Sequence, residues 1–237
     1  MSHLTRLRYL LPLLLLTACT PYVQTTSGTE YISRQDANGR LSIDRDIAEI
    51  AAVEPNLRFP ARIGIARVVN GQLSDVPGAE ADLFADVVKQ SARYGEFVPV
   101  SPLIDAMVNH DQKIDTIHRI RRASARQHLD YVLIYEIGAR TRRTDTPFAL
   151  ADVTLIGGAF LPTRNIKVAG IGQAMLIDVR NGYPYGTAAV TEDISGLARS
   201  FGTRRREAEL RDRAALNVAQ TLIPDIDQML SDLYQRR

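Results

Sequence analysis

The chain has 237 residues and a mass of 26.3 kDa, which suits one globular domain with some appended sequence. Its 45% hydrophobic and 24% charged residues exclude a disordered chain and a polytopic membrane protein. Its single cysteine excludes an internal disulfide framework and a cysteine-rich metal site. Its formal net charge is only +2.

The first 18 residues have the pattern of a bacterial export signal. Arg6 and Arg8 precede an apolar run over 9–16, which is shorter than the roughly 20 residues that span a bilayer as a helix. The run ends in Leu16-Thr17-Ala18-Cys19, which resembles the bacterial lipobox, Leu-x-Ala/Gly-Cys. This resemblance implies that the chain is cut before Cys19 and that the cysteine is acylated on its sulfur and on its new amine. The alternative is an ordinary secretory peptide with a chance cysteine.

Thr20 follows the predicted lipidation site. By resemblance to sorted lipoproteins of Gram-negative bacteria, a residue other than Asp at this position implies passage to the outer membrane, on its periplasmic side. The covalent lipid on Cys19 is then the only group expected on the protein, and no cofactor is expected. Cleavage removes two arginines and no acid, which leaves 27 basic and 27 acidic residues. The neutral mature chain therefore gives no indication of a nucleic-acid partner.

The sequence predicts three parts: a signal peptide over 1–18, a polar tether over 19–57 and a single α/β domain over 58–237. One short helix is expected over 46–53 of the tether. The tether as a whole would hold the domain away from the membrane. In the domain, strands are expected at 61–69, 97–100 and 129–139, the last apolar on both faces and therefore central. Helices are expected at 79–94 with Gly95 at its C′ position, at 102–108, and at 114–127 with Ile117, Ile120, Ala123 and Ser124 inward.

The second half of the domain carries a hairpin and a long helix. Strands over 166–179 and 185–193 flank Asn181-Gly182, a hairpin signal. Residues 204–234 keep apolar side chains at helical spacing, which predicts an amphipathic helix kinked at Pro224. Gly170-Ile171-Gly172 lacks the third glycine of a dinucleotide fingerprint, so a bulge or a close backbone contact is expected there.

This order of elements predicts an α/β domain of the layered α+β kind, with a mixed β-sheet, flanking helices and a long C-terminal helix. The lipobox, the polar tether, the strand over 61–69, the central strand over 129–139 and the hairpin sequence LIDVRNG over 176–182 resemble the CsgG-type periplasmic lipoproteins. That superfamily shares the fold of the TolB N-terminal domain and of LpoB. The resemblance covers roughly residues 60–235.

Acidic and histidine residues lie close together at one place in the sequence, which comprises His110, Asp111, Asp115 and His118. On one helix, Asp111, Asp115 and His118 would point the same way as metal ligands, but acids also suit the start of a solvated helix. We expect no metal. The sequence has no nucleophile elbow, phosphate loop or zinc-protease motif, so catalysis is disfavoured, and an envelope hydrolase is an alternative only.

Two further regions are candidate binding sites. The first is an arginine patch for anionic partners, for which the alternative is a solvated helix face with pairs such as Glu207–Arg211 and Glu209–Arg213. It comprises Arg199, Arg204, Arg205, Arg206, Arg211 and Arg213. The second is the apolar, glycine-rich segment 144–165, which could be an added strand or cover, a protein-binding or self-association surface, or a membrane-inserting hairpin. Its candidate interface residues are Phe148, Leu150, Leu155, Ile156, Phe160 and Leu161.

These observations favour a lipid-anchored, non-enzymatic binding or scaffold subunit of an envelope assembly or secretion system. The alternative within transport is a subunit of an oligomeric secretion pore of the CsgG type. The expected partners are the membrane, through the acyl chains, and envelope proteins that the sequence does not identify. A homo-oligomer is also possible.

Overall fold

The computed structural model describes residues 21–34, 43–90, 92–108, 115–145, 164–198 and 203–237. They form one seven-stranded mixed sheet, which confirms the predicted α+β class. The strands run β1-β7-β6-β5-β2-β3 across the sheet, and β4 pairs with β2 off this path. Their bounds are β1 Tyr22–Val23, β7 Pro184–Ala198, β6 Arg164–Asp178, β5 Tyr131–Asp145, β2 Ala61–Val69, β3 Gln72–Ser74 and β4 Gly95–Pro99.

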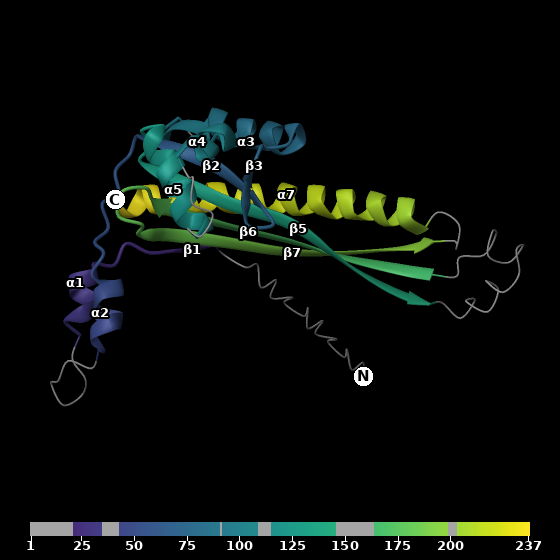
Figure 1. The fold of residues 1–237 in the computed structure, drawn as a ribbon, viewed down its shortest axis with the longest axis horizontal. Helices are drawn as coiled ribbons and strands as arrows, with labels where there is room; N and C mark the ends of the chain where they lie inside the picture. The colour runs from purple at the N-terminus through teal and green to yellow at the C-terminus, as the bar shows by residue number, and fades with distance from the viewer. Residues whose placement is uncertain (1–20, 35–42, 91, 109–114, 146–163, 199–202) are drawn as a thin grey trace, which may run out of the picture.

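The helices divide between the two faces of the sheet and one end. The long α7 (Thr203–Arg236) and α3 (Gly78–Gln90) cover one face, while α4 (Pro102–Val108) and α5 (Thr116–Arg126) cover the base of the other. The short α1 (Gly28–Ile32) and α2 (Arg45–Ala51) form a lobe beyond the end of the strands, on the side of the molecule opposite to α3 and α4 (Figure 1).

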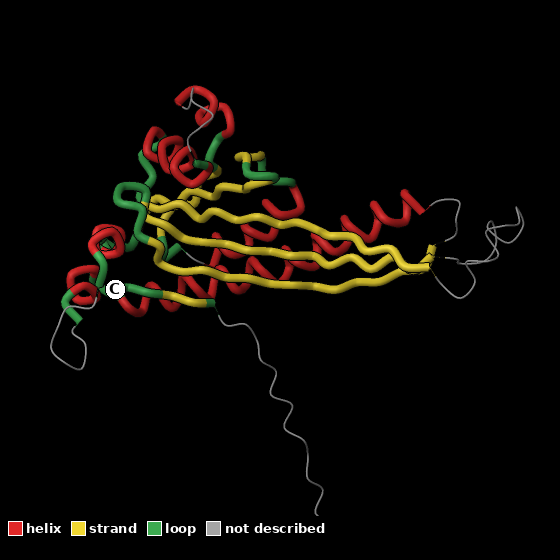
Figure 2. Tube along the Cα trace, turned by 60° about the horizontal axis from the view of Figure 1, so that its bottom comes forward, coloured by secondary structure: helices red, strands yellow, loops and turns green. Residues whose placement is uncertain are grey.

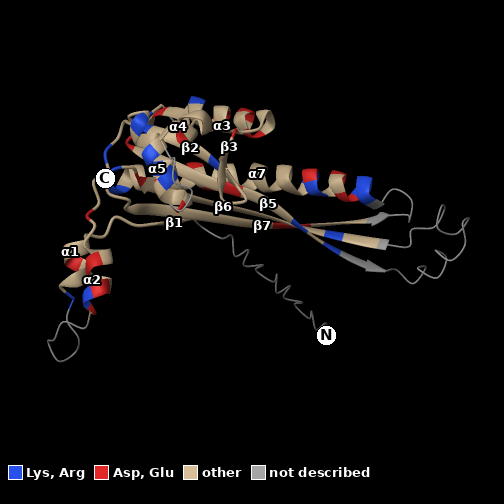
Figure 3. Cartoon of the chain, in the orientation of Figure 1, with Lys and Arg blue, Asp and Glu red and all other residues tan. Residues whose placement is uncertain are grey.

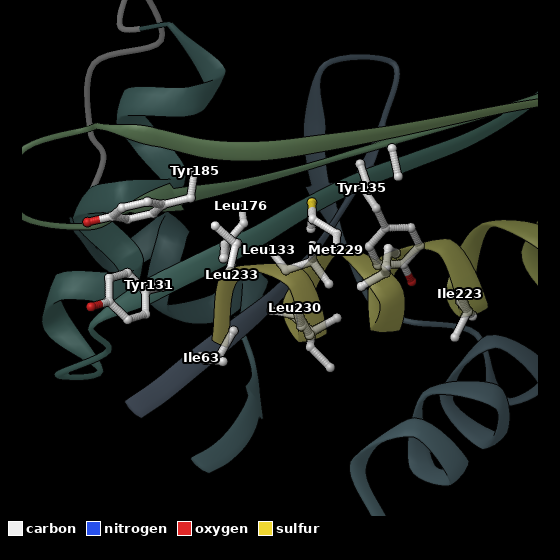
Figure 4. Close-up of a cluster of buried hydrophobic side chains, with 14 of the residues drawn as sticks. Ile63, Tyr131, Leu133, Tyr135, Leu176, Tyr185, Ile223, Met229, Leu230 and Leu233 are labelled. Carbon is white, nitrogen blue, oxygen red and sulfur yellow. The ribbon is translucent and has the colours of Figure 1, made fainter. Parts of the chain in front are cut away.

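The packing of α7 on the sheet forms most of the core. At about 1.5 Å per residue its 34 residues span about 51 Å, and the 15-residue strands β5, β6 and β7 span about 50 Å at 3.3 Å per residue. Figure 2 shows these strands side by side, with α7 running along them. In Figure 4, Leu133 and Leu176 of the strands face Met229, Leu230 and Leu233 of α7, and all five are fully buried.

Glycines let the helix approach the strands closely. A Cβ on Gly170 would lie 2.7 Å from Val218 Cγ2, and one on Gly172 would lie 2.5 Å from Val218 Cγ1. Both distances are too short for a carbon–carbon contact, so only glycine fits at this helix separation. The expectation of a close contact at Gly170-Ile171-Gly172 is therefore confirmed.

Most predicted elements are present, with corrected bounds. The helix expected to reach residue 94 ends at Gln90, and Gly95 does not cap it. Gly95 instead begins β4 with φ of 117°, and a Cβ there would collide with the backbone of Ala61.

Ile117, expected inward, is 43% exposed, whereas Ile120, Ala123 and Ser124 are buried. The helix α7 continues through Pro224, whose side chain is on the exposed side.

The segment expected as a tether contributes to the folded domain. Tyr22 and Val23 form β1, which pairs with Thr187 and Gly186 of β7, and Val23 is buried. The helix α1 was not expected, and α2 covers most of the one predicted over 46–53. Leu57 packs on the main core. The folded structure therefore begins well before the boundary predicted at residue 58.

The far end of the sheet is a three-stranded ribbon with open edges. The pairing between β2 and β5 ends at Val68 and Glu136, so residues 137–145 of β5 have β6 alone as a described neighbour. On the other side, β1 covers only Gly186 and Thr187 of β7. Residues 188–198 therefore have a described neighbour on one side only.

Candidate binding face of the sheet

The ribbon presents one bare face. Side chains alternate along strands, so the face opposite α7 carries one residue in every two. The helices α4 and α5 cover this face only at its base, where Ile134 and Ile177 are buried. Beyond Glu136 no described helix covers it. The bare face comprises Gly138, Arg140, Arg142, Lys167, Ala169, Ile171, Gln173, Ala189, Thr191, Asp193 and Ser195.

The base of the bare face contains a mostly apolar hollow of about 440 Å³. It lies where β5, β6 and β7 meet the start of α5. Val68, Ile134, Met175 and Ala189 give it apolar walls, and the half-exposed Ile117 closes one side. Such a hollow accepts an apolar side chain more readily than a charged one.

The hollow continues along the ribbon and becomes basic. It shares Glu136 and Gln173 with a second hollow, which in turn shares Arg140 with a third of about 410 Å³. The charged residues of the third hollow are Arg140, Arg142 and Lys167 against Asp193. Figure 3 shows these basic segments on the far parts of β5 and β6. We call these three adjoining hollows the trough: it is apolar at its base and basic at its far end.

The covered face carries a charged cluster that is buried and paired. Arg67 Nε donates to Glu80 Oε2 at 2.9 Å, and the Tyr135 hydroxyl donates to the same oxygen at 2.7 Å. Burial, followed by the hydrogen bond to the Glu80 carboxylate, raises the pKa of Tyr135. These contacts fix the start of α3 on the sheet, and every member has a partner, which indicates a structural role.

The turn between β6 and β7 organises the end of the domain opposite the ribbon tip. The buried Asp178 accepts hydrogen bonds from the backbone N–H of Arg180 at 2.7 Å and of Asn181 at 3.2 Å. Arg180 reaches Asp130 at 2.7 Å, and Gly182 adopts φ of 79°. Asn181 and Gly182 thus lie in a tight hairpin turn that side chains support, as predicted.

The candidate residues of the sequence fall in different places. Cys19 and the apolar residues Phe148, Leu150, Leu155, Ile156, Phe160 and Leu161 lie outside the described residues. The ends of their segment are nevertheless fixed, because Asp145 and Arg164 are paired across β5 and β6. Residues 146–163 therefore connect the paired ends of β5 and β6 along the chain.

Five arginines of the candidate anion patch lie in the first turns of α7, and Arg199 is outside the described residues. Glu209 pairs with Arg205 at 3.3 Å and with Arg206 at 3.2 Å. The acid thus pairs toward the start of the helix instead of with Arg213. Arg204, Arg211 and Arg213 are exposed, and their role as an anion patch stays a prediction.

The acid and histidine cluster is divided. His110 and Asp111 lie outside the described residues, and Asp115 is the N-cap of α5, where its carboxylate accepts from the backbone N–H of His118 at 3.0 Å. Within the described ranges, no three His, Cys, Asp or Glu side chains are grouped as metal ligands would be. The same ranges contain no helix with the length and hydropathy needed to cross a membrane.

Sequence reasoning missed the basic end of the trough. The predicted strand ends at residue 139, before Arg140 and Arg142, because charged residues rarely indicate a strand core. Their period-two spacing around Thr141 was the available signal, since it is typical of a strand with one solvated face. Lys167 lies in a predicted strand, but its position opposite Arg142 follows only from the register.

Comparison with protein-family models and with curated proteins finds no match. Several solved structures are similar in fold. A minor lipoprotein from Acinetobacter baumannii is 9% identical, with a TM-score of 0.36, covering 70% of this chain and 92% of that one. The PelC dodecamer from Paraburkholderia phytofirmans is 13% identical, with a TM-score of 0.34 and coverages of 72% and 86%. The rare lipoprotein B from Shewanella oneidensis is 11% identical, with a TM-score of 0.31 and coverages of 74% and 95%. Two of these three similar proteins are bacterial lipoproteins by name, and similarity at this level assigns no residue role to this chain.

Proposed function

We propose that this protein is a lipid-anchored, non-enzymatic binding subunit on the periplasmic side of the outer membrane. Acyl chains on Cys19 hold it there, and the trough on the bare sheet face binds a protein partner of an envelope assembly or secretion system. The observation that carries the proposal is the contrast within the trough, which has an apolar hollow at one end and basic side chains at the other.

The trough favours one kind of partner segment. An apolar side chain fits the base between Ile134 and Met175, and carboxylates of the same segment suit Arg140, Arg142 and Lys167 at the far end. The basic side chains outnumber Asp193, so a basic segment is disfavoured. Because the face is exposed, a partner can be gained or lost without unfolding the domain.

Photo-crosslinking in intact envelopes tests this proposal. A photoreactive residue in place of the exposed Gln173, in the middle of the trough, should give a discrete adduct with a partner protein. The R140E/K167E double variant should reduce that adduct strongly. The matched control R126E/R236E makes the same change of charge on exposed helical positions and should leave it intact. An adduct of equal yield in R140E/K167E would contradict the proposal.

The open edges of the ribbon favour a second candidate function, a subunit of an oligomeric secretion pore. Along 137–145 of β5 and 188–198 of β7, one edge has no neighbouring strand among the described residues, and such an edge can pair with another copy of the chain. Detergent-extracted protein would then run as a large ring. The G138C/T191C variant would give disulfide-linked ladders if copies pair through these strands, and the only native cysteine that could interfere is Cys19. A monomer without ladders would exclude this candidate.

A further inference from the structure

The predicted lipid anchor lies very close to the folded sheet. Tyr22, three residues after Cys19, is already paired with Thr187 of β7. An extended chain spans at most about 3.3–3.6 Å per residue, so Cys19 lies within about 11 Å of β1. If acyl chains on Cys19 enter the bilayer, the β1 edge of the sheet must lie at the membrane surface.

From Tyr22 onward the chain is held to the domain and is not a free linker. Gln24 donates its backbone N–H to the Tyr185 carbonyl at 2.8 Å, and its side chain donates to the Pro184 carbonyl at 2.7 Å. The Tyr183 hydroxyl donates to the carbonyl of Thr26 at 2.7 Å. These successive bonds carry the chain from β1 into α1 without slack.

The α1–α2 lobe is attached in the same way. Glu54 Oε1 accepts hydrogen bonds from the backbone N–H and the hydroxyl of Thr29, both at 2.7 Å, and from the Ser27 hydroxyl at 3.1 Å. Asn181 of the β6–β7 turn donates to the Glu54 carbonyl at 2.8 Å. The lobe therefore keeps a defined position relative to β1.

This part of the molecule exposes an unusual share of large apolar side chains. Eight such residues are exposed in the described chain, and four of them lie in the short stretch 22–50. They are Tyr22 at 61%, Tyr31 at 47%, Ile47 at 44% and Ile50 at 74% exposure. Tyr22, Tyr31 and Ile50 line one hollow of about 620 Å³, together with Arg34 and Arg121.

We propose that the surface formed by Tyr22, Tyr31, Ile47 and Ile50 contacts the head-group layer of the membrane that holds Cys19. We call it the membrane-contact surface. This inference rests on the proposed acylation of Cys19 and specifies how the domain is oriented. Tyrosines suit the membrane–water interface, and an isoleucine 74% exposed gains by entering it. The edge strand β3, at the other side of the sheet, then lies farthest from the bilayer.

Apolar insertion, and not net charge, supports this contact. Arg34 lies 5.7 Å from the centre of the Tyr31 ring and can reach lipid phosphates. However, Glu30, Asp46 and Glu49 are also exposed on the lobe. The surface therefore fits a zwitterionic bilayer, and the contact should persist at high salt.

Tryptophan fluorescence tests the proposal, because the chain contains no tryptophan. The full, lipidated protein is reconstituted in phosphatidylcholine vesicles with brominated acyl chains, as I50W and separately as L103W. Leu103 is the matched control, since it is 83% exposed on α4, on the opposite side of the molecule. We expect a blue shift and a loss of emission for I50W, unchanged by high salt, and neither for L103W. Circular dichroism of both variants checks that they are folded.

The outcomes separate this inference from the proposed function. Protein that fails to float with the vesicles would contradict the anchor itself. Protein that floats while I50W and L103W emit alike would overturn the membrane-contact surface and leave the anchor intact. Quenching of I50W that disappears at high salt would also overturn it, because the contact would then be ionic.

Discussion

The two faces of the ribbon belong to the same three strands but have different chemistry. On the face under α7, glycines and buried aliphatic residues meet the helix along the whole length of the strands. On the opposite face, most of the residues beyond Glu136 are charged, polar or small, and Ile171 is a large apolar residue among them. The difference shows that coverage by a helix, and not pairing within the sheet, decides which side chains must be apolar.

The contrast between the two faces also indicates which of them is available for binding. The covered face is constrained by packing, so a substitution there alters the free energy of unfolding. The bare face has no such constraint on its side chains, and its apolar hollow and basic end are therefore free to serve binding. Substitutions on the covered face should therefore change stability, and substitutions on the bare face should change binding.

The largest effect is expected at the buried charged cluster on the covered face. Glu80→Ala leaves Arg67 and Tyr135 without their shared carboxylate and should lower the free energy of unfolding by about 3–5 kcal/mol. Denaturant unfolding measures this loss. The triple variant E80L/R67M/Y135F removes all the polar partners and should recover most of it. A triple variant no more stable than E80A would show that the cluster matters for another reason.

A pair of glycines on opposite faces gives the sharpest comparison. A Cβ at Gly172 would crowd Val218 and Leu222 of α7, so Gly172→Ala should cost about 1–3 kcal/mol. Gly138 faces open space, with no atom within 4 Å of an added Cβ. Gly138→Ala should therefore stabilise by about 0.4–1 kcal/mol, because it restricts the unfolded chain. Equal losses at both positions in thermal unfolding would contradict the assignment of the faces.

Charge reversal on the bare face should hardly change stability. Arg140 and Lys167 are exposed, so R140E/K167E should shift the free energy of unfolding by less than about 0.5 kcal/mol. The loss of the crosslinked adduct would then report binding alone. A large destabilisation would instead show that these side chains support the ribbon.

The smallest effect concerns the α1–α2 lobe, beyond the end of the sheet. Hydrogen bonds from Thr29 and Ser27 lower the pKa of Glu54 below its usual 4.5. The ionised carboxylate therefore stabilises the lobe above about pH 4.5, and this contribution is lost as the pH falls through the lowered pKa. Protection factors of the α1 amides, which divide out the intrinsic pH dependence of hydrogen exchange, should be high at neutral pH and lower in acid. Glu54→Gln should remove most of this difference, and an unchanged pH dependence would contradict the assignment.

Regular elements could be predicted from the sequence because local patterns determine them. The bounds of β2 agree with the prediction, Leu133 and its neighbours form a central strand, and Asn181-Gly182 forms the hairpin turn. The strand β1 could not be predicted, since two residues carry no periodicity and their partners are far along the chain. The strand β5 was predicted too short because residues 140–145 are polar at every position, so no apolar side chain marks one face.

The candidate site was less predictable than the fold. The trough combines residues of β2, β5, β6 and β7, and only the register brings Arg142 beside Lys167. The interface predicted over 144–165 is not tested, because residues 146–163 lie outside the described residues. The role of that segment and the acylation of Cys19 stay predictions.

The pairing of β1 with β7 has a consequence for how the protein is made. Tyr22 is synthesised early, but Thr187, its partner in β7, follows 165 residues later. The central strand β5 likewise needs β6 and α7, which come later. Contacts between such distant residues form slowly. The N-terminal strand β1 therefore stays unpaired until β7 has been synthesised. If Cys19 is acylated as proposed, this delay would leave it accessible before the sheet closes around β1.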